Sequence, residues 1–309
     1  MSLKKSKLGG FEKFNRVPPY VNVIIAIIFI ILAIVCILPV VLVFMVSISS
    51  EQSIQNVGYR FWPTEFSSQA YSYLYNSKDS ILRAFGVSII VTILGTIVGL
   101  ILNTSIAYAL SRKNFKFKSF FTWVIFIPML FNGGMISSYI VVSNMLKLKD
   151  TIWALILPMA VSSFNIIILR TFFQTTIPDS LIESAKLDGA NQMRIFTTIV
   201  LPISLPAIAT IGLFLTFAYW NDWYNALLYI DNSTLVPIQA LLNRIQGDIA
   251  FINQNVSLLG ASAAEVLAKL PSESVRMAIV ILVVFPIACS YPFFQKYFIS
   301  GLTIGAVKE

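Results

Sequence analysis

The 309-residue chain has no histidine, only two cysteines, and few charged residues, 12% of the total. The absence of histidine excludes Ser-His-Asp and Cys-His nucleophile pairs, His-ligated zinc or haem, and a histidine pH switch. Cys36 and Cys289 both lie within apolar stretches. They are too few for a four-cysteine metal site and predict no disulfide framework, so we interpret both as small apolar packing residues.

What the chain does contain is mostly apolar: 57% of its residues are hydrophobic, and the mean hydropathy is +0.80. Soluble domains are about a quarter charged, so an ordinary water-soluble globule is excluded, and so is a disordered chain. The net charge of +8 comes from basic residues that cluster at the ends of apolar runs. This placement indicates membrane topology rather than nucleic-acid binding.

Six apolar stretches are long enough to predict membrane-spanning helices. The first is too long for the core of a signal peptide and lacks a small-residue cleavage site, so we expect an uncleaved helix. The third contains Pro128 and the helix-breaking run Asn132-Gly133-Gly134. The predicted fold class is an all-α polytopic membrane protein with spans over residues 20–47, 82–110, 120–142, 151–172, 205–230 and 275–298.

Basic residues predict the orientation of these spans, because cytoplasmic loops are rich in Lys and Arg. The N-terminal tail 1–19 and the segment Ser111–Ser119 are densely basic. We therefore expect these two segments and the C-terminal tail 305–309 in the cytoplasm. The turn 143–150 carries two lysines and weakly opposes this orientation. The segments expected outside are 48–80, with a short helix over Gln69–Asn76, and the polar loop 231–274.

Gly95 and Gly99 lie four residues apart in the second span. This spacing lets two helices approach closely. Glycine is also common in membrane helices without such a role. The sequence leaves both interpretations open.

The sequence lacks the groups that would drive transport or catalysis by this chain alone. No GxxxxGK[ST] phosphate loop occurs, so if ATP drives transport, another chain must hydrolyse it. No paired acids lie at mid-membrane depth, which disfavours an ion-coupled carrier acting alone. A membrane-embedded enzyme would also need ionisable groups at depth, and the spans do not supply them.

The polar segment between the fourth and fifth spans predicts a helical hairpin. The first helix, Pro178–Leu187, has acid near its start and ends at Asp188-Gly189, a helix-stop signal. Asn191 can cap a second helix over Gln192–Leu201, which Pro202 would terminate.

Both helices of this hairpin have apolar faces larger than an isolated hairpin can cover. This favours docking into a groove on a cytoplasmic partner; a loop lying on the bilayer surface is the alternative. The apolar residues are Leu181, Ile182 and Ala185 on the first helix, and Ile195, Phe196, Ile199 and Val200 on the second.

The hairpin contains a longer pattern with many fixed positions. It reads Glu183-Ser184-Ala185, then Asp188-Gly189-Ala190, then Phe196, Ile199, Leu201-Pro202 and Pro206. This resembles the EAA loop of ABC importer permeases, EAA-x-x-DGA followed by F-x-x-I-x-LP-x-x-x-P. Ser184 stands where alanine is commonest, a change to another small residue.

The resemblance extends over nearly the whole chain. It is closest to permeases of carbohydrate importers, of the maltose-type second permease, in the subgroup handling oligosaccharides or glycan fragments. The further segments that carry it are Asn132-Gly133-Gly134-Met135, Asp150–Ala154, Ile168–Phe173, Phe217–Trp223 and Gln295–Lys308.

The resemblance implies a type I ABC importer transmembrane domain over residues 20–304, in the bacterial cytoplasmic membrane. Such a chain is a transport subunit, not an enzyme, and binds no cofactor itself; ATP and Mg are bound by the partner ATPase. The implied partners are a second homologous permease in a heterodimer, two cytoplasmic ABC ATPase subunits, an extracellular solute-binding lipoprotein, and a sugar or oligosaccharide, but no nucleic acid.

In this family the hairpin, here residues 176–206, is the coupling helix. It sits in a cleft of the ATPase and transmits ATPase closure to the transmembrane pathway. The coupling residues carried over by position are Glu183, Ser184, Ala185, Asp188, Gly189, Ala190 and Phe196.

Candidates for sugar contact are aromatic and polar side chains within spans. The run Tyr219-Trp220-Asn221-Asp222-Trp223 has suitable chemistry in span five, although Trp and Tyr also form interfacial belts. Asn132 and Asn165 serve either as links between helices or as pathway lining. The resemblance further implies that loop 231–274 contacts the binding protein, with Asn243, Gln246, Asn253 and Asn255 as candidates, unless it is an ordinary surface loop.

The leading interpretation is thus the permease subunit of an ATP-driven sugar importer, forming half of the translocation pathway. An ABC permease for a non-sugar solute, such as a peptide or a polyol, is the alternative within the same class. An ion-coupled secondary carrier is the alternative from another class, and it would transport without an ATPase.

Overall fold

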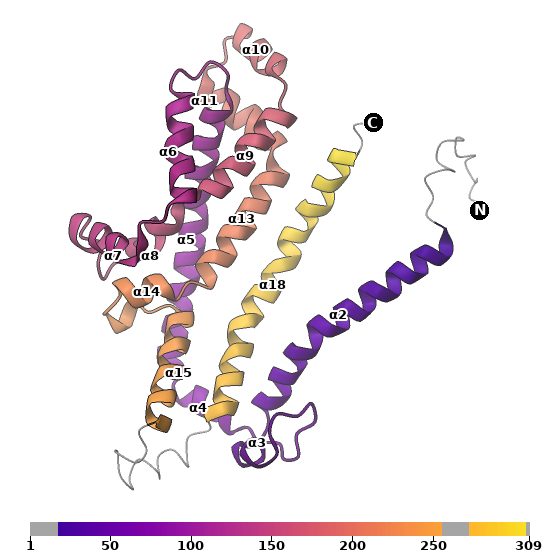
Figure 1. Ribbon diagram of the computed structural model, residues 1–309, viewed down its shortest axis with the longest axis vertical. Coiled ribbons are helices and arrows are strands. Elements are labelled where there is room, and N and C mark those ends of the chain that lie inside the picture. Colours follow the sequence, from indigo (N-terminus) through magenta and orange to yellow (C-terminus); the bar gives the residue numbers. More distant parts are fainter. Residues whose placement is uncertain (1–17, 255–271, 307–309) are drawn as a thin grey trace. The chain divides into compact units, whose positions relative to one another are not determined.

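The computed structural model describes residues 18–254 and 272–306 (Figure 1). Predictions for the tail 1–17 and for Asn255 lie outside this part of the chain. The described residues form helices and no strand beyond one isolated bridge between Ser49 and Phe66. The chain divides into two compact units, one made of residues 1–71 with 271–278, the other of 72–270 with 279–309.

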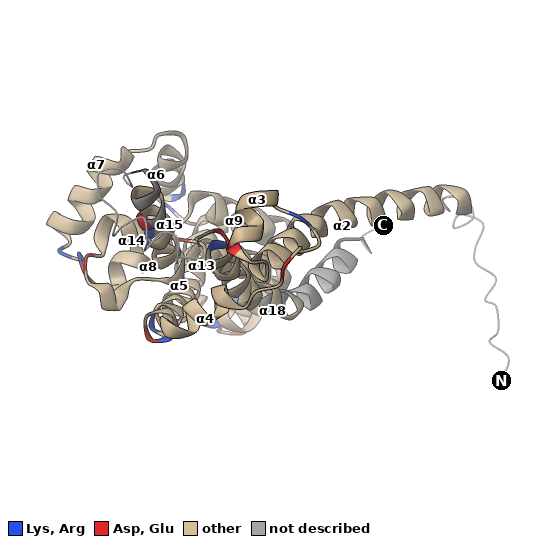
Figure 2. Cartoon of the chain, turned by 90° about the horizontal axis from the view of Figure 1, so that it is seen from below, with Lys and Arg blue, Asp and Glu red and all other residues tan. Residues whose placement is uncertain are grey.

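The first unit contains α2 (Pro19–Ser47) and α3 (Glu51–Val57). No residue of α2 is charged, as its unbroken tan colour in Figure 2 shows, and this helix is long enough to cross a membrane. The Ser50 hydroxyl caps α3 by accepting a hydrogen bond from the amide of Ser53 at 3.2 Å.

The start of α18 (Ser272–Ala306) is anchored within the same unit. The Glu51 carboxylate accepts hydrogen bonds from the backbone amides of Glu273 and Ser274 and from the Ser274 hydroxyl, at 3.0–3.2 Å. The Tyr59 hydroxyl donates to the Glu273 carboxylate at 2.7 Å. The Glu51 carboxylate thus accepts from amides in the first turn of α18, which have no partner inside the helix.

The second unit is organised around α5 (Lys78–Ser111). It packs against α13 (Leu205–Trp220), α9 (Ser163–Thr176) and α8 (Ile152–Ala160). In Figure 1, α5 extends from α15 at one end of the unit to α10 and α11 at the other. The largest fully buried side chains along its path include Leu155, Ile156, Ile166, Leu169, Phe173, Ile195 and Ile211.

The two glycines of α5 mark its close contact with α13. A Cβ atom at Gly95 would lie 2.6 Å from the Tyr219 ring, and one at Gly99 would lie 3.0 Å from Leu215. The Tyr219 hydroxyl donates to the Ile156 carbonyl of α8 at 2.8 Å. The glycines therefore serve close helix packing, the first of the two interpretations of their spacing.

The fourth predicted span is broken. α8 and α9 meet at an angle of 48° across Val161-Ser162. Asn103 of α5 is fully buried at this break: its amide donates to the Ala160 carbonyl at 2.8 Å and its Oδ1 accepts from the Ser162 amide at 3.1 Å. One side chain thus satisfies backbone groups on both sides of the interruption.

The third and fifth predicted spans are not continuous helices either. α6 (Lys118–Leu130) has only 13 residues; after a break with Gly134 at φ +80°, α7 (Gly134–Tyr139) and a π-helix (Ile140–Met145) follow. α13 ends at Trp220, and α14 (Tyr224–Tyr229) follows. Within the described residues two helices can cross a membrane by length and composition, or up to four when two bent pairs count as spans.

The segment predicted as an outer polar loop, 231–274, contains regular helix in its described first part. A 3₁₀ turn (Ser233–Leu235) leads into α15 (Ile238–Gln254), whose Ile238, Leu242 and Ile245 lie against α5 and α18. Their helical spacing was an available signal that the interspersed polar residues obscured. The short helix predicted over Gln69–Asn76 is confirmed as α4.

We predict that Gly95→Ala destabilises the protein, because the added methyl group would overlap the Tyr219 ring. Overpacking of this kind costs about 1–3 kcal/mol. Gly86→Ala is the matched control in the same helix, since a Cβ there meets nothing within 4 Å. Thermal unfolding of the purified protein should show a lower midpoint for Gly95→Ala only; equal midpoints would contradict the packing assignment.

We also predict that Asn103→Leu is destabilising, because it leaves the Ala160 carbonyl and the Ser162 amide without their side-chain partner. Each buried group left unpaired costs about 1–3 kcal/mol. Thr104→Val is the control, because the Thr104 hydroxyl bonds only to carbonyls of its own helix. In the same unfolding measurement, a loss of stability for Thr104→Val as large as that for Asn103→Leu would contradict the role of Asn103 at the α8–α9 break.

Candidate functional site

The hairpin between α9 and α13 is a defined turn between two helices. α10 (Asp179–Leu187) ends in Gly189 at φ +80°, and the amides of Gly189 and Ala190 donate to the carbonyls of Lys186 and Ala185 at 3.0 Å. This is a Schellman termination, which requires the left-handed conformation that glycine adopts freely. The predicted helix stop at Asp188-Gly189 is confirmed.

The second arm begins where predicted but ends later. The Asn191 side chain caps α11 (Gln192–Ile195) by accepting from the Arg194 amide at 2.8 Å. The helix continues through a π-helical stretch (Phe196–Val200) and α12 (Leu201–Ile203). It ends at Ile203, one residue beyond Pro202, and the chain then bends by 82° before α13, so the stop predicted near Pro202 is confirmed to within two residues.

The apolar faces of the hairpin pack mainly on the chain itself. Ile182, Ala185, Ile195 and Val200 are buried in the main core, with Phe196 and Ile199 against it. Of the predicted apolar face only Leu181 is exposed. The inference that these faces need a partner to cover them was therefore wrong for most of them.

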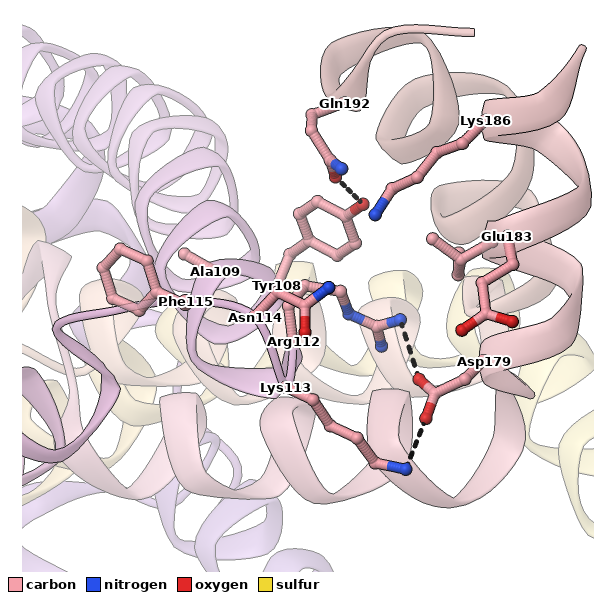
Figure 3. Close-up of a pocket in the computed structure, with 11 residues that line it drawn as sticks. Tyr108, Ala109, Arg112, Lys113, Asn114, Phe115, Asp179, Glu183, Lys186 and Gln192 are labelled. Atoms are coloured by element: carbon pink, nitrogen blue, oxygen red, sulfur yellow. Dashed lines mark hydrogen bonds and ion pairs between the residues drawn. The ribbon is translucent and has the colours of Figure 1, made fainter. Parts of the chain in front are cut away.

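Both arms of the hairpin are attached to the end of α5 (Figure 3). For the second arm, the Tyr108 hydroxyl donates to Oε1 of Gln192 at 2.9 Å, and its ring stacks on Phe196 at 4.9 Å between centroids. For the first arm, the Asp179 carboxylate lies 2.7 Å from the Lys113 ammonium and 3.8 Å from the Arg112 guanidinium. The hairpin therefore has two anchors, one on the last turn of α5 and one on the two basic residues that follow it.

The anchor of the first arm, between Asp179 and Lys113, is electrostatic. The hydrogen bond from Lys113 lowers the pKa of Asp179, and the same bond raises the pKa of Lys113. A lowered carboxyl pKa means that the pair is intact at neutral pH and is lost as the pH falls through that pKa. The raised pKa of Lys113 means that at high pH the pair is lost only as the pH rises through the pKa of Lys113. Lys113 is largely exposed, so salt screens the pair.

A cavity of about 530 Å³ lies between the end of α5 and the hairpin. Its walls carry both charge signs, with Asp179 and Glu183 on α10 opposite the basic residues that follow α5 (Figure 3). The remaining lining residues are Tyr108, Ala109, Arg112, Lys113, Asn114, Phe115, Ile182, Lys186 and Gln192.

The outer surface of the hairpin is accessible and mixed in character. Leu187 and Met193 are 89% and 68% exposed, although both are large and apolar. The predicted coupling residues Glu183, Ser184, Asp188 and Gly189 are exposed, whereas Ala185 is buried and Ala190 and Phe196 are half-buried. Exposed apolar side chains beside acids are a surface suited to a protein partner.

Comparison with known proteins identifies the family. No family model matches the chain. The polygalacturonan/rhamnogalacturonan transport system permease protein YtcP of Bacillus subtilis is 41% identical over 266 residues, 86% of this chain and 90% of YtcP. The chain belongs to the permease subunits of sugar and oligosaccharide ABC importers. Protein LplC of the same organism is 38% identical over 85% of this chain and 86% of LplC.

A solved structure agrees with this membership. It is the crystal structure of a bacterial ABC transporter involved in the import of the acidic polysaccharide alginate. One of its chains matches with a TM-score of 0.76 and 29% identity, over 90% of this permease and 96% of that chain. The protein is therefore a transport subunit and not an enzyme, and a partner ATPase hydrolyses ATP.

The structure separates the candidates for sugar contact into buried and exposed residues. Tyr219 and Trp220 are 2% and 5% exposed; Trp220 donates to the Val283 carbonyl at 3.2 Å, so both are packing residues of this chain. This burial contradicts their assignment to a pathway surface. Asn165 is buried as well. The candidates with exposed surface are Asn132, Asn221 and Trp223, with Asp222 half-buried.

The binding-protein candidates belong to α15 or lie beyond it. Asn243 and Gln246 are half-buried on this helix, rather than at the tip of a loop. Asn253 lies in its last turn. The Arg244 guanidinium of the same helix donates to the Ile230 carbonyl at 2.9 Å, which holds α15 beside the end of α14.

Sequence reasoning missed the anchor residues of the hairpin. Arg112 and Lys113 were interpreted only as orientation signals, and Asp179 only as helix-terminal acid. Tyr108 and Gln192 carried no signal. The pairing of Lys113 with Asp179 joins residues 66 positions apart, which no local spacing rule reveals.

We predict that Lys113→Gln loosens the first arm, because Asp179 keeps its position at the start of α10 but loses its closest cation. Hydrogen exchange of the α10 amides in the assembled transporter should become faster at pH 7. Lys116→Gln, an exposed lysine of the same loop that forms no ion pair within the described residues, is the control. The difference should shrink at high salt; identical exchange in wild type and Lys113→Gln would contradict the anchor.

Proposed function

We propose that the hairpin of this permease couples closure of a partner ATPase to alternating access of the sugar pathway. The observation that carries the proposal is the exposure of Leu187 and Met193 at the tip of a hairpin whose other face is buried. An apolar tip flanked by Glu183 and Asp188 suits insertion into a partner's groove. Two anchors on α5 would make the hairpin move together with that helix rather than bend away from it.

We propose six spans, with both termini in the cytoplasm of a bacterium. α2, α5 and α18 would each form one span. The other three would be bent: α6 with α7 and the π-helix, α8 with α9, and α13 with α14. At 1.5 Å per residue, α6 alone reaches only about 20 Å, short of the roughly 30 Å hydrocarbon core.

The proposed assembly contains a second permease, two ATPase subunits that bind ATP and Mg, and an extracellular binding protein. Within the described residues of its own unit, none of the 18-residue apolar core of α2 is buried. We propose that lipid and the second membrane subunit contribute to covering this surface. The exposed Asn132, Asn221 and Trp223 are the residues that we propose line the pathway.

We propose that the substrate is an oligosaccharide released from an acidic glycan. Support comes from two comparisons: the similar YtcP is named for polygalacturonan and rhamnogalacturonan, and the similar crystal structure concerns alginate. The two galacturonans contain galacturonic acid, a sugar acid, and alginate is an acidic polysaccharide. The alternative within the family is a non-sugar solute.

Coupling predicts that Leu187→Asp and Glu183→Lys each reduce sugar uptake roughly tenfold or more, as loss of an interface hot spot of about 2 kcal/mol would. The protein should still reach the membrane, because neither side chain is buried. Ser184→Ala, an exposed position on the same helix, should transport normally. Uptake and co-purification of the ATPase are the measurements; if both charge variants retain both, the coupling assignment fails.

The substrate proposal predicts that a strain lacking this chain loses uptake of oligogalacturonates but keeps uptake of monosaccharides. The plasmid-borne gene should restore it. Labelled oligogalacturonates, neutral oligosaccharides, a peptide and a polyol form the test panel. Loss of only the peptide or polyol would favour the non-sugar alternative, and loss of only neutral oligosaccharides would contradict the acidic substrate.

A further inference from the structure

Two cations near the hairpin lie outside the ion pairs that Asp179 forms. Arg170 of α9 and Lys118 at the start of α6 form no ion pair within the described residues, since Asp179 pairs with Arg112 and Lys113. Lys118 is half-buried, and the positive charges of Arg170 and Arg112 act on its ammonium group. The Nε atom of Arg170 is buried and has no hydrogen-bond partner. Two like charges are therefore held close together in partly buried positions.

An apolar groove begins at Arg170. It has a volume of about 220 Å³ and lies between α5, α6 and α9, all within the second unit. Ile125, Phe126 and Ile167 are among its walls, and apart from the Arg170 and Thr122 side chains the lining is hydrocarbon. Phe126 is also exposed, so the groove reaches the outside of the helix bundle.

We propose that this groove is a binding site for an anionic phospholipid, with its phosphate at Arg170 and Lys118 and one acyl chain along the wall of α6 and α9. Charge complementarity selects the headgroup, because two unpaired cations favour an anion and guanidinium hydrogen-bonds phosphate strongly. The apolar wall selects a lipid over free phosphate. Basic pockets between membrane helices are known to hold such headgroups.

The site is independent of the coupling proposed for the hairpin, so bound lipid rather than sugar uptake is the quantity to measure. The purified transporter, containing the full chain and its partner subunits, is stripped of lipid in detergent. Dioleoyl phosphatidylglycerol is then titrated in and the bound molecules are counted by native mass spectrometry. Phosphatidylcholine with the same acyl chains is the headgroup control, and salt is kept high enough to screen exposed charges.

Three variants separate a built site from general attraction to a basic surface. Arg170→Gln should weaken phosphatidylglycerol binding about tenfold, as loss of a charge-assisted hydrogen bond would. Ile167→Phe keeps the charge but narrows the groove, and should also weaken binding. Lys116→Gln removes an exposed lysine that does not line the groove and should leave binding nearly unchanged.

Several outcomes would overturn the site. These are equal binding of the two lipids, equal losses for Arg170→Gln and Lys116→Gln, or full binding by Ile167→Phe. Competition by water-soluble glycerol phosphate at concentrations as low as those of the lipid would instead identify a free phosphate site. If Arg170→Gln fails to assemble, Ile167→Phe and the headgroup comparison still decide the matter.

Discussion

Inside a bilayer, every backbone N–H and C=O must find a partner within the protein. At three of the helix breaks in the described part of this permease, a nearby Asn or Asp side chain supplies the partner. Asn103 bonds both sides of the α8–α9 break. The side-chain Oδ1 of Asn132 accepts from the backbone amide of Gly134 at 2.8 Å, and the Asp222 carboxylate accepts from the backbone amide of Asn225 at 3.2 Å. Polar residues in these spans therefore have a structural task before any contact with sugar is considered.

The same breaks explain why α5 is central. It is the longest described helix that lies wholly within the second unit, and the interrupted helices contact it: α8 and α9 through Asn103, and α13 through Gly95 and Gly99. The hairpin joins this arrangement through Lys113 and Tyr108 at the end of the helix. A displacement of the hairpin would therefore act on α5 as a rigid body, since packed helices shift as units rather than deform continuously.

Prediction from sequence succeeded where the signal was local. The apolar runs gave α2, α5 and α18 to within a few residues except at the C-terminal end of α18, and Gly189 and Asn191 gave the hairpin turn and cap. It failed where distant residues decide the structure. The hydropathy pattern shows Tyr219 and Trp220 only as aromatic residues of a span. Their burial depends on distant partners: the Tyr219 ring packs on Gly95 of α5, and Trp220 donates to the Val283 carbonyl. The interruption of the third span was local as well: the run Asn132-Gly133-Gly134 predicted it, and the break between α6 and α7 with Gly134 at φ +80° confirms it.

Basic residues illustrate this limit most directly. The positive-inside rule treats Arg112, Lys113 and Lys118 as equivalent signals of orientation. In the folded chain the first two form ion pairs with Asp179, whereas Lys118 forms none within the described residues. Charge density on a membrane flank thus predicts only the side of the membrane. Which cation holds the hairpin and which remains available to a ligand follows from the position of a single carboxylate, because Asp179 can compensate only the cations within its reach.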